Sequence, residues 1–430
     1  MKRLFLLGLC AAMLFAAGCG SNTLNSAGCA ASMGGKQNDT SAVQKAATPD
    51  YPQPGDKREP SYGSKLQSAL AGFSSRTASA LLGNGQENAA YSPISLYMAL
   101  ALSASGAAGE TLDEIYSLLG LAGIGKSEVA KGVNALFTDL YSEEEYGHLL
   151  LYNSLWLSSD FSFKQSFLTG AADDYFAEIY TVDPSKELNT DPISDWVGEK
   201  TGGKLERAPS EFGESVMSLV SVVNFYGEWT NQFSKDRNTV ADFYLADGTK
   251  VDAEYMNSGA MGDFYRSDGW TLASLQCKNS ASMVFILPDE GVDINALFAD
   301  EGKVSKMFAP SDYFESLYGE IEWAIPKFDI VSNLSLKETL IDLGMQSAFK
   351  QDADFSETSA SKPLFLSDAK QASRVTVDEN GVSATSYTEL NYAGSAMPQD
   401  KAAMVLNRPF AFVINYRGVT LFAGIVNDPS

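Results

Sequence analysis

Apolar side chains recur at helical spacing in the first half of the chain. Leu66, Leu70 and Phe73 are separated by four and three residues, which predicts an amphipathic helix. The dipeptide Ser92-Pro93 predicts the start of a second helix, because serine is a preferred N-cap and proline is tolerated at the first helical position.

Two further signals mark helix ends in this half. Residues 111–114, Thr-Leu-Asp-Glu, have the spacing of a capping box, and Gly120 is a suitable residue for the C-terminal end of that helix. Asp191-Pro192 predicts the start of another helix, which should end near Gly202-Gly203.

The later half of the chain has the pattern of strands. Apolar or alternating runs occupy residues 242–245, 251–255, 282–287, 374–378, 410–416 and 420–426, and an earlier run covers 149–157. Asp247-Gly248 and Arg417-Gly418 separate neighbouring runs and predict two hairpins. Because helices and strands are grouped rather than alternating, the pattern indicates an α+β fold.

Composition narrows the class of protein. An apolar content of 45% is enough for a sizeable core, and 31 basic against 54 acidic residues give a net charge of −23. Such a surface repels phosphate backbones, which argues against nucleic acid as a partner. The cysteines at 10, 19, 29 and 277 contain no Cys-x-x-Cys pair, so neither a zinc site nor a disulfide framework is predicted. We expect Cys277 to be a buried small hydrophobic residue.

The N-terminus has the pattern of an export signal. Lys2-Arg3 precedes an apolar run from Leu4 to Ala17, which is too short to span a membrane. The residues before Cys19, Ala-Ala-Gly, resemble a bacterial lipobox. We therefore predict a lipoprotein-type signal peptide over residues 1–18 and lipidation of Cys19, with ordinary secretion after cleavage at an alanine as the alternative.

Residues 19–60 are mainly small and polar, and they predict a disordered tether before a single folded domain over 61–430. Several acyl chains on one cysteine make a stable anchor. The mature protein is therefore expected on the extracellular face of the cell membrane, held by the lipid anchor only, or secreted.

Conventional catalytic chemistry is not supported. His148 is the only histidine, and we expect it in a solvated turn before the run 149–157. A Ser-His-Asp triad would need this residue as its base, and no Gly-x-Ser-x-Gly turn accompanies it. Gly202-Gly203-Lys204 lacks the spacing of a phosphate-binding loop and is better explained as a helix stop. We predict no enzyme activity, no metal and no cofactor.

The segment 379–398 is the most informative part of the chain. It begins with the turn Glu-Asn-Gly and continues through small and hydroxylated residues. One alternating set of side chains carries no charge, and the other carries only Glu389; the uncharged set is Val382, Ala384, Ser386, Thr388, Leu390 and Tyr392. This pattern allows the segment to exist either as a loop or as a buried strand.

Several short motifs, in a fixed order, resemble the serpin family over almost all of 61–430. They are Ser92-Pro-Ile-Ser95, residues 106–115, Trp196-Val with Thr201-Gly-Gly-Lys-Leu205, Phe225-Tyr-Gly-Glu-Trp229, Pro326-Lys-Phe328, Leu343-Gly-Met345, Ala353-Asp-Phe-Ser356 and Arg408-Pro-Phe410. The resemblance implies one domain with three β-sheets and eight to nine helices. It also implies a monomer with a mobile reactive-centre loop.

The implied function is suicide inhibition of serine proteases, in which the cleaved loop inserts into a β-sheet and traps the acyl-enzyme. The residues of the hinge and inserting loop would be Glu379, Gly381, Val382, Ala384, Ser386 and Thr388. None of the inward-facing side chains is charged or a proline, which favours insertion. The alternative is a non-inhibitory binding module on the same fold.

The resemblance places the cleaved bond fourteen residues beyond Gly381, at Ser395–Ala396. Counting back from Phe410 leads instead to the neighbourhood of Pro398. Small residues around Ser395 suit a serine protease of the elastase or subtilisin kind, with a cysteine protease as an alternative target.

The resemblance also assigns residues to the region where the sheet opens. Ser92, Ser95, Ser221 and Gln371 match the family's shutter, and Trp229 matches the tryptophan near the point of loop entry, the breach. Many members have asparagine at the position of Ser221 and histidine at that of Gln371, so the hydrogen bonds that control opening are altered in this chain.

Overall fold

The computed structural model describes residues 42–52, 63–83, 85, 87–186, 188, 190–205, 216–359, 364–382 and 400–430. The predicted signal peptide, the lipidation site Cys19 and the predicted cleavage site Ser395–Ala396 lie outside these residues. The predicted inserting residues Ala384, Ser386 and Thr388 lie outside them as well. No helix in the described part of the chain is long and apolar enough to cross a membrane.

Nine α-helices form among the described residues. They are α1 (Gly63–Leu82), α2 (Pro93–Ser105), α3 (Gly109–Leu118), α4 (Lys126–Leu140), α5 (Gln165–Asp173), α6 (Pro192–Lys200), α7 (Ile294–Phe298), α8 (Glu301–Phe308) and α9 (Lys337–Asp342), with 3₁₀ turns at Lys235–Arg237, Pro310–Asp312 and Ser347–Phe349. The helices predicted from residue 66, from Ser92-Pro93 and from Asp191-Pro192 are confirmed as α1, α2 and α6.

The capping box predicted over residues 111–114 is wrong. The helix α3 begins earlier, at Gly109, and its N-cap Ala108 makes no side-chain cap. The Thr111 hydroxyl accepts instead from the backbone N–H of Asp354 at 2.9 Å, and Glu114 accepts from backbone N–H groups at residues 346 and 347. Distant backbone donors therefore satisfy the side chains that the local pattern had assigned to the helix start.

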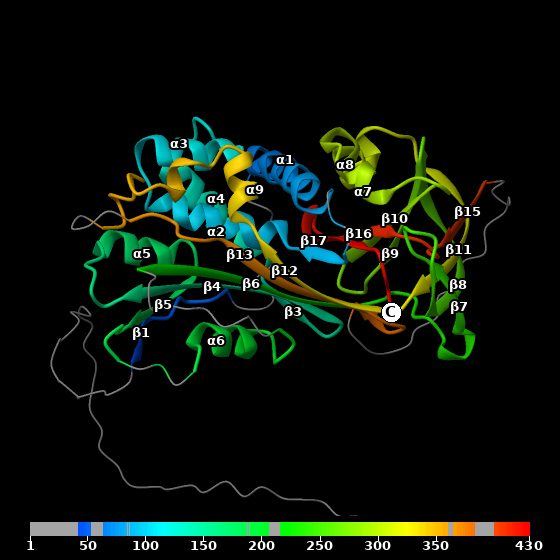
Figure 1. Ribbon diagram of the computed structural model, residues 1–430, viewed down its shortest axis with the longest axis horizontal. Helices are drawn as coiled ribbons and strands as arrows, with labels where there is room; N and C mark the ends of the chain where they lie inside the picture. Colours follow the sequence, from blue (N-terminus) through cyan, green and yellow to red (C-terminus); the bar gives the residue numbers. More distant parts are fainter. Residues whose placement is uncertain are drawn as a thin grey trace, which may run out of the picture. The chain divides into compact units, whose positions relative to one another are not determined.

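The first sheet, sheet 1, has the order β1-β5-β4-β6-β14, with β3 paired to β4. Its strands are β1 (Val43–Ala47), β3 (Ser142–Glu144), β4 (Gly147–Ser158), β5 (Ala177–Val182), β6 (Met217–Glu228) and β14 (Gly381–Val382). Helices α2 and α5 lie on one face of sheet 1 and α6 lies on the other face (Figure 1).

The second sheet, sheet 2, has the order β15-β11-β8-β9-β10-β16-β17-β2, with β7 paired to β8. Its strands are β2 (Ala89–Tyr91), β7 (Thr239–Tyr244), β8 (Lys250–Ser267), β9 (Trp270–Gln276), β10 (Ala281–Pro288), β11 (Leu317–Pro326), β15 (Asp400–Val405), β16 (Phe410–Tyr416) and β17 (Val419–Val426). The two predicted hairpins are confirmed as β7–β8 and β16–β17.

A separate antiparallel pair is formed by β12 (Phe328–Ser335) and β13 (Lys370–Val377). The main core joins the helices to both sheets through buried apolar side chains such as Phe73, Leu155 and Phe285. Cys277 belongs to this core as a buried free thiol, as predicted. The α+β prediction is confirmed, with the helices mainly in the first half of the chain.

The predicted tether is wrong for the residues nearest the domain. Val43–Ala47 form β1, which pairs antiparallel with β5 and covers the edge of sheet 1. Tyr51 follows and stacks on Phe137 and Tyr141, with ring centroids 6.4 and 5.8 Å apart. An edge strand needs no apolar pattern of its own, because the ladder is made by backbone groups. The small and polar composition of residues 19–60 as a whole therefore concealed the strand.

A buried carboxylate links β1 to α6. Glu178 on β5 is 2% exposed. The Nζ atoms of Lys45 on β1 and Lys200 at the end of α6 each lie 3.0 Å from it. Trp196 Nε1 donates to the same carboxylate at 3.0 Å, and the hydroxyl of Tyr180, two residues further along β5, donates to it as well. Burial alone would raise the pKa of Glu178, but these hydrogen bonds outweigh it and lower the pKa to about 2.

We predict that Glu178→Gln destabilises the fold by about 3 kcal/mol at pH 7, because two cations lose their buried partner. The folded pKa lies below the ordinary value of 4.5, so this stabilisation is present above pH 4.5 and disappears as the pH falls towards 2. Thermal unfolding of both proteins across this range measures the difference. Glu199→Gln is the matched control, because Glu199 pairs with Lys200 at 3.3 Å but is 74% exposed. Equal losses from the two variants would contradict the role of Glu178.

Candidate functional site

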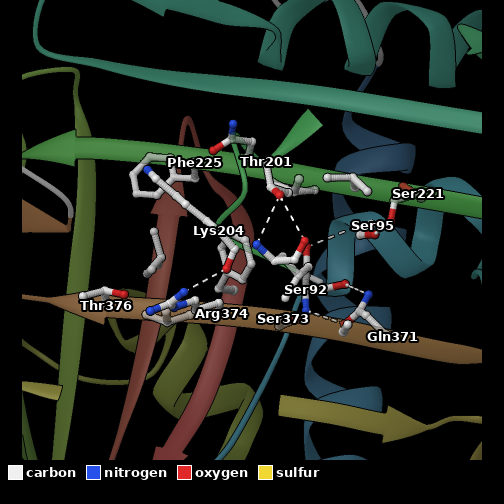
Figure 2. A pocket seen from close by; sticks show the side chains of 18 of the residues that line it. Ser92, Ser95, Thr201, Lys204, Ser221, Phe225, Gln371, Ser373, Arg374 and Thr376 are labelled. Atoms are coloured by element: carbon white, nitrogen blue, oxygen red, sulfur yellow. Dashed lines mark hydrogen bonds between the residues drawn. The ribbon is translucent and has the colours of Figure 1, made fainter. Parts of the chain in front are cut away.

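The strands β6 and β13 run side by side with no ladder between them in the described part of the chain. β6 pairs with β4 and β14, whereas β13 pairs with β12. A cavity of about 270 Å³ lies between them and is lined by residues 221–225 of β6 and 371–376 of β13. We call this space the central gap; Figure 2 shows its lining side chains.

One end of the central gap is closed by the start of α2. The Ser95 hydroxyl donates to the backbone carbonyl of Ser221 on β6 at 3.1 Å. Gln371 on β13 donates its amide to the Ser92 carbonyl at 3.0 Å, and its carbonyl accepts from the Ser92 N–H at 2.7 Å. Because Ser92 also caps α2, one helix terminus is tied to both strands (Figure 2). The four residues predicted for the shutter are therefore brought together.

The other end of the central gap is organised by Trp229, which is 1% exposed. Its indole Nε1 donates to the carbonyl of Asp378 at 3.0 Å, and its backbone N–H donates to the carbonyl of Asn380 at 3.1 Å. Both acceptors belong to the turn that follows β13. The residue predicted for the breach thus holds the start of the loop by two separate bonds.

Glu379 in the same turn is a buried carboxylate. Lys327 Nζ lies 3.3 Å from it, and Asn238 donates its side-chain amide to it. Burial raises the pKa of Glu379, but the hydrogen bonds and the nearby ammonium more than compensate and leave the pKa below its ordinary value. The residue is therefore ionised at neutral pH, and it anchors the turn to sheet 2 through Lys327, which lies next to β11.

The turn reverses the chain and directs it back towards the central gap. Asp378 Oδ1 accepts from the N–H of Asn380 at 2.8 Å. Gly381 and Val382 then form β14, antiparallel to β6 and opposite Glu228 and Gly227. A Cβ atom on Gly381 would lie 2.4 Å from the Gly227 carbonyl oxygen, so no other residue fits this position without movement. Two residues of the predicted hinge, Gly381 and Val382, thus already pair as a strand.

A short segment that begins with the last residue of α6 spans the central gap. On the β6 side, Asn224 Nδ2 donates to the Lys200 carbonyl at 3.1 Å. On the β13 side, Arg374 Nη1 donates to the Lys204 carbonyl at 3.0 Å (Figure 2). We call residues 200–205 the crossbar. The sequence indicated only a helix stop at this point, and nothing in it signalled that Arg374 would bind this backbone.

His148 supports the same structure and corrects another prediction. It lies within β4 rather than in a solvated turn, and its Nε2 is 3.2 Å from Asn224 Oδ1. Burial lowers the pKa of His148, so the imidazole is neutral at pH 7. The ring therefore orients the amide that holds the crossbar.

The geometry suits one operation, which is the addition of an extended strand. Edge strands present unpaired N–H and C=O groups that template another strand. A net stabilisation of about 1 kcal/mol for each hydrogen bond makes ten new ladder bonds worth on the order of 10 kcal/mol. No cluster of His, Cys, Asp or Glu that could hold a metal is found in the described ranges.

Comparison with known proteins agrees with this geometry. The family described as Serpin (serine protease inhibitor) matches residues 68–429. The alpha-1-antitrypsin homolog of Cyprinus carpio is 26% identical over 328 residues, covering 75% of this chain and 86% of that protein. Serpin-Z7 of Hordeum vulgare is 28% identical over 384 residues, covering 83% and 95%.

Solved structures share the fold. The native state of the thermophilic serpin tengpin matches with a TM-score of 0.76 at 28% identity, covering 88% of this chain and 97% of that one. Thyroxine-binding globulin in complex with thyroxine matches with a TM-score of 0.74 at 23% identity, covering 85% and 100%. The second likeness concerns the fold alone.

We predict that Arg374→Met speeds the entry of a synthetic peptide of residues 381–393 into the central gap by about three- to tenfold, because one hydrogen bond to the crossbar is lost. Incorporation of a fluorescently labelled peptide measures the rate. Arg374 also pairs with Asp329, with Nε 2.8 Å from Oδ1. Asp329→Asn is therefore the control, since it weakens that pair and keeps the bond to Lys204. An unchanged rate for Arg374→Met would show that the crossbar is no barrier.

Proposed function

The chain belongs to the serpin family, and from this premise we propose that it is a suicide inhibitor of serine proteases. Curated relatives are described as a serine protease inhibitor and as alpha-1-antiproteinase, which supports the reaction class. The observation that supports the mechanism most directly is the central gap, with its two strand edges and with β14 already turned towards it. We assign no catalytic turnover to the chain itself.

The proposed reaction begins as an ordinary proteolysis. The serine oxygen of the protease attacks the carbonyl carbon of Ser395, and the peptide nitrogen of Ala396 leaves after accepting a proton. An ester then joins the protease to Ser395. The released strand continues from β14 into the central gap, and fourteen residues at about 3.3 Å each carry the protease roughly 46 Å. Inhibition results when this movement is faster than hydrolysis of the ester.

The site that the protease reads is proposed to be Ala393-Gly394-Ser395-Ala396. Small side chains fill a shallow specificity pocket, whereas trypsin-like enzymes need arginine or lysine. A bond after Met397 is less suitable, because Pro398 would follow the scissile carbonyl with a fixed φ and no N–H. The proposed target is therefore an elastase- or subtilisin-like protease.

We predict that pancreatic elastase or subtilisin forms a complex with this protein that survives denaturing electrophoresis and releases a C-terminal peptide beginning at Ala396. The mass of that peptide identifies the bond. A separate sample of the protein can be cleaved within the loop by a protease that forms no complex with it. This cleaved protein should unfold at a clearly higher temperature than the intact chain, because the inserted loop is a new strand paired on both sides. Cleavage by every protease with no complex would instead fit a non-inhibitory binding module.

Substitution of the hinge provides the control for this experiment. Val382→Arg places a charge on β14, where the inserting strand begins, and the desolvation of that charge opposes keeping β14 in the sheet and extending it. That variant should be cleaved at the same bond without a stable complex. Val382→Thr keeps a β-branched side chain and should retain the complex. A full yield of complex from Val382→Arg would contradict insertion as the trapping step.

We also propose that the protein is exported and held outside the cytoplasmic membrane by lipid on Cys19. The support is the sequence: an apolar run that ends in Ala-Ala-Gly-Cys, followed by a polar segment. Cys19→Ala should leave the protein unlipidated and shift it from the membrane fraction. Mass spectrometry of the N-terminal peptide provides the readout, and Cys29→Ala is the matched control. An unmodified Cys19 in the wild-type protein would refute the anchor.

A further inference from the structure

The turn that leads into β14 contains an asparagine followed directly by a glycine, Asn380-Gly381. The chain has this dipeptide at one other place, Asn84-Gly85. The backbone nitrogen that follows an asparagine can attack the side-chain amide, which closes a succinimide ring and releases ammonia. Glycine permits this reaction best, because it has no side chain to hinder the attacking nitrogen. Packing requires glycine at position 381, since a Cβ atom there would lie 2.4 Å from the Gly227 carbonyl oxygen.

The carboxylate of Asp378 contacts both nitrogen atoms that would take part in this reaction. Its Oδ1 accepts from the backbone N–H of Gly381, the attacking nitrogen, at 3.3 Å. Its Oδ2 accepts from the side-chain Nδ2 of Asn380, the leaving group, at 3.2 Å. The carboxylate is therefore placed to take a proton from the nucleophile and to give a proton to the departing ammonia.

The carbonyl of the same peptide group also accepts hydrogen bonds. The backbone N–H of Trp229 donates to the Asn380 carbonyl oxygen at 3.1 Å, and Gln232 Nε2 donates to it at 3.3 Å. When the nitrogen of Gly381 loses its proton, negative charge spreads through the peptide group onto this oxygen. Donors that already point at an oxygen that gains charge stabilise the transition state without reorganisation. The turn therefore supplies both an acid–base group and donors for the developing charge.

We propose that Asn380-Gly381 is a site of self-catalysed deamidation, with Asp378 as its acid–base group, and that the reaction limits the lifetime of inhibition. A bond forms between Gly381 N and Asn380 Cγ, the bond between Cγ and Nδ2 breaks, and the proton from Gly381 leaves with the ammonia. Water then opens the ring at either of its carbonyl carbons, and it can reach the site because Asn380 is only half-buried. The products are aspartate and a β-linked aspartate, whose main chain is longer by a methylene group.

Both products disturb the start of β14. Aspartate places a second carboxylate where Asn380 Nδ2 now lies 3.2 Å from Asp378 Oδ2, and two like charges at this separation repel each other. The additional methylene group shifts Gly381 relative to Glu228, its partner on β6. Because the inserted strand begins at β14, weaker pairing there slows insertion relative to hydrolysis of the ester. This consequence rests on the proposed function, whereas the deamidation itself does not.

The first test compares the rate of deamidation with and without the fold. The full chain is kept at neutral pH and digested at intervals, and mass spectrometry gives the deamidated fraction of each Asn-Gly peptide. A synthetic peptide of residues 374–386 gives the rate without the fold, and Asn84-Gly85 in the same molecules is the internal reference. Asn380 should react about tenfold faster in the protein than in the peptide. A rate in the protein equal to or below that of the peptide would overturn the self-catalysed site.

Two variants test the groups assigned to the reaction. Asp378→Ser keeps a short acceptor in the turn but removes the acid–base group, so deamidation of Asn380 should slow about tenfold. Gln232→Leu leaves Asp378 in place and removes one donor from the Asn380 carbonyl, so the rate should fall about fivefold. Asn231→Leu, at the exposed neighbouring position, is the matched control and should leave the rate unchanged. Rates that are unchanged or higher in both test variants would overturn the assignment.

The aged samples test the effect on inhibition. Each yield of covalent complex with pancreatic elastase or subtilisin is divided by the yield from the same protein when fresh. This ratio should fall in step with the deamidated fraction of Asn380. It should stay constant for Asn380→Gln, whose longer side chain closes a ring far more slowly. A constant ratio in deamidated wild type would overturn the limit on inhibition. Absence of complex from fresh wild type would overturn the proposed function and that limit, while the deamidation rates decide the modification site independently.

Discussion

The structure depends on two strand edges that face each other without a common ladder. Backbone N–H and C=O groups are strong hydrogen-bonding groups, and leaving them without a strand partner forgoes stabilisation that an inserted strand would supply. Between β6 and β13 this deficit is concentrated in a single space of about 270 Å³. The fold therefore keeps a position for one more strand, and the adjoining turn delivers the chain that could fill it.

Three groups of hydrogen bonds hold the central gap in the form seen in this structure. α2 ties both strands at one end through Ser92 and Ser95, and Trp229 holds the turn at the other end. The crossbar spans the middle through Asn224 and Arg374. Each group contains only a few hydrogen bonds, and each bond contributes about 1 kcal/mol. These bonds are strong enough to order the site, and they are weak enough to be replaced by the hydrogen bonds of an inserted strand.

The crossbar also connects the central gap to the N-terminal strand. Lys200 ends α6, accepts the side-chain amide of Asn224 at its carbonyl, and places its ammonium on Glu178. The same carboxylate binds Lys45 on β1. A strand at one edge of sheet 1 and the central gap therefore share one helix end, which binds both of them directly.

The sequence determined the elements whose cause is local. The helix starts predicted at Ser92-Pro93 and Asp191-Pro192 and the two predicted hairpins are confirmed. Capping and turn geometry depend on a few adjacent residues, so a local pattern is enough to predict them. Motif order was also sufficient to group Ser92, Ser95, Ser221 and Gln371 before their contacts were known.

Tertiary structure alone decided the rest. Thr111 and Glu114 bind a distant backbone, residues 43–47 become a strand because a partner edge exists, and His148 lies within β4 against the side-chain amide of Asn224. In each case the residue's partner lies far away in the sequence. A local pattern of residues carries no information about which distant group will lie beside it and bind it in the fold.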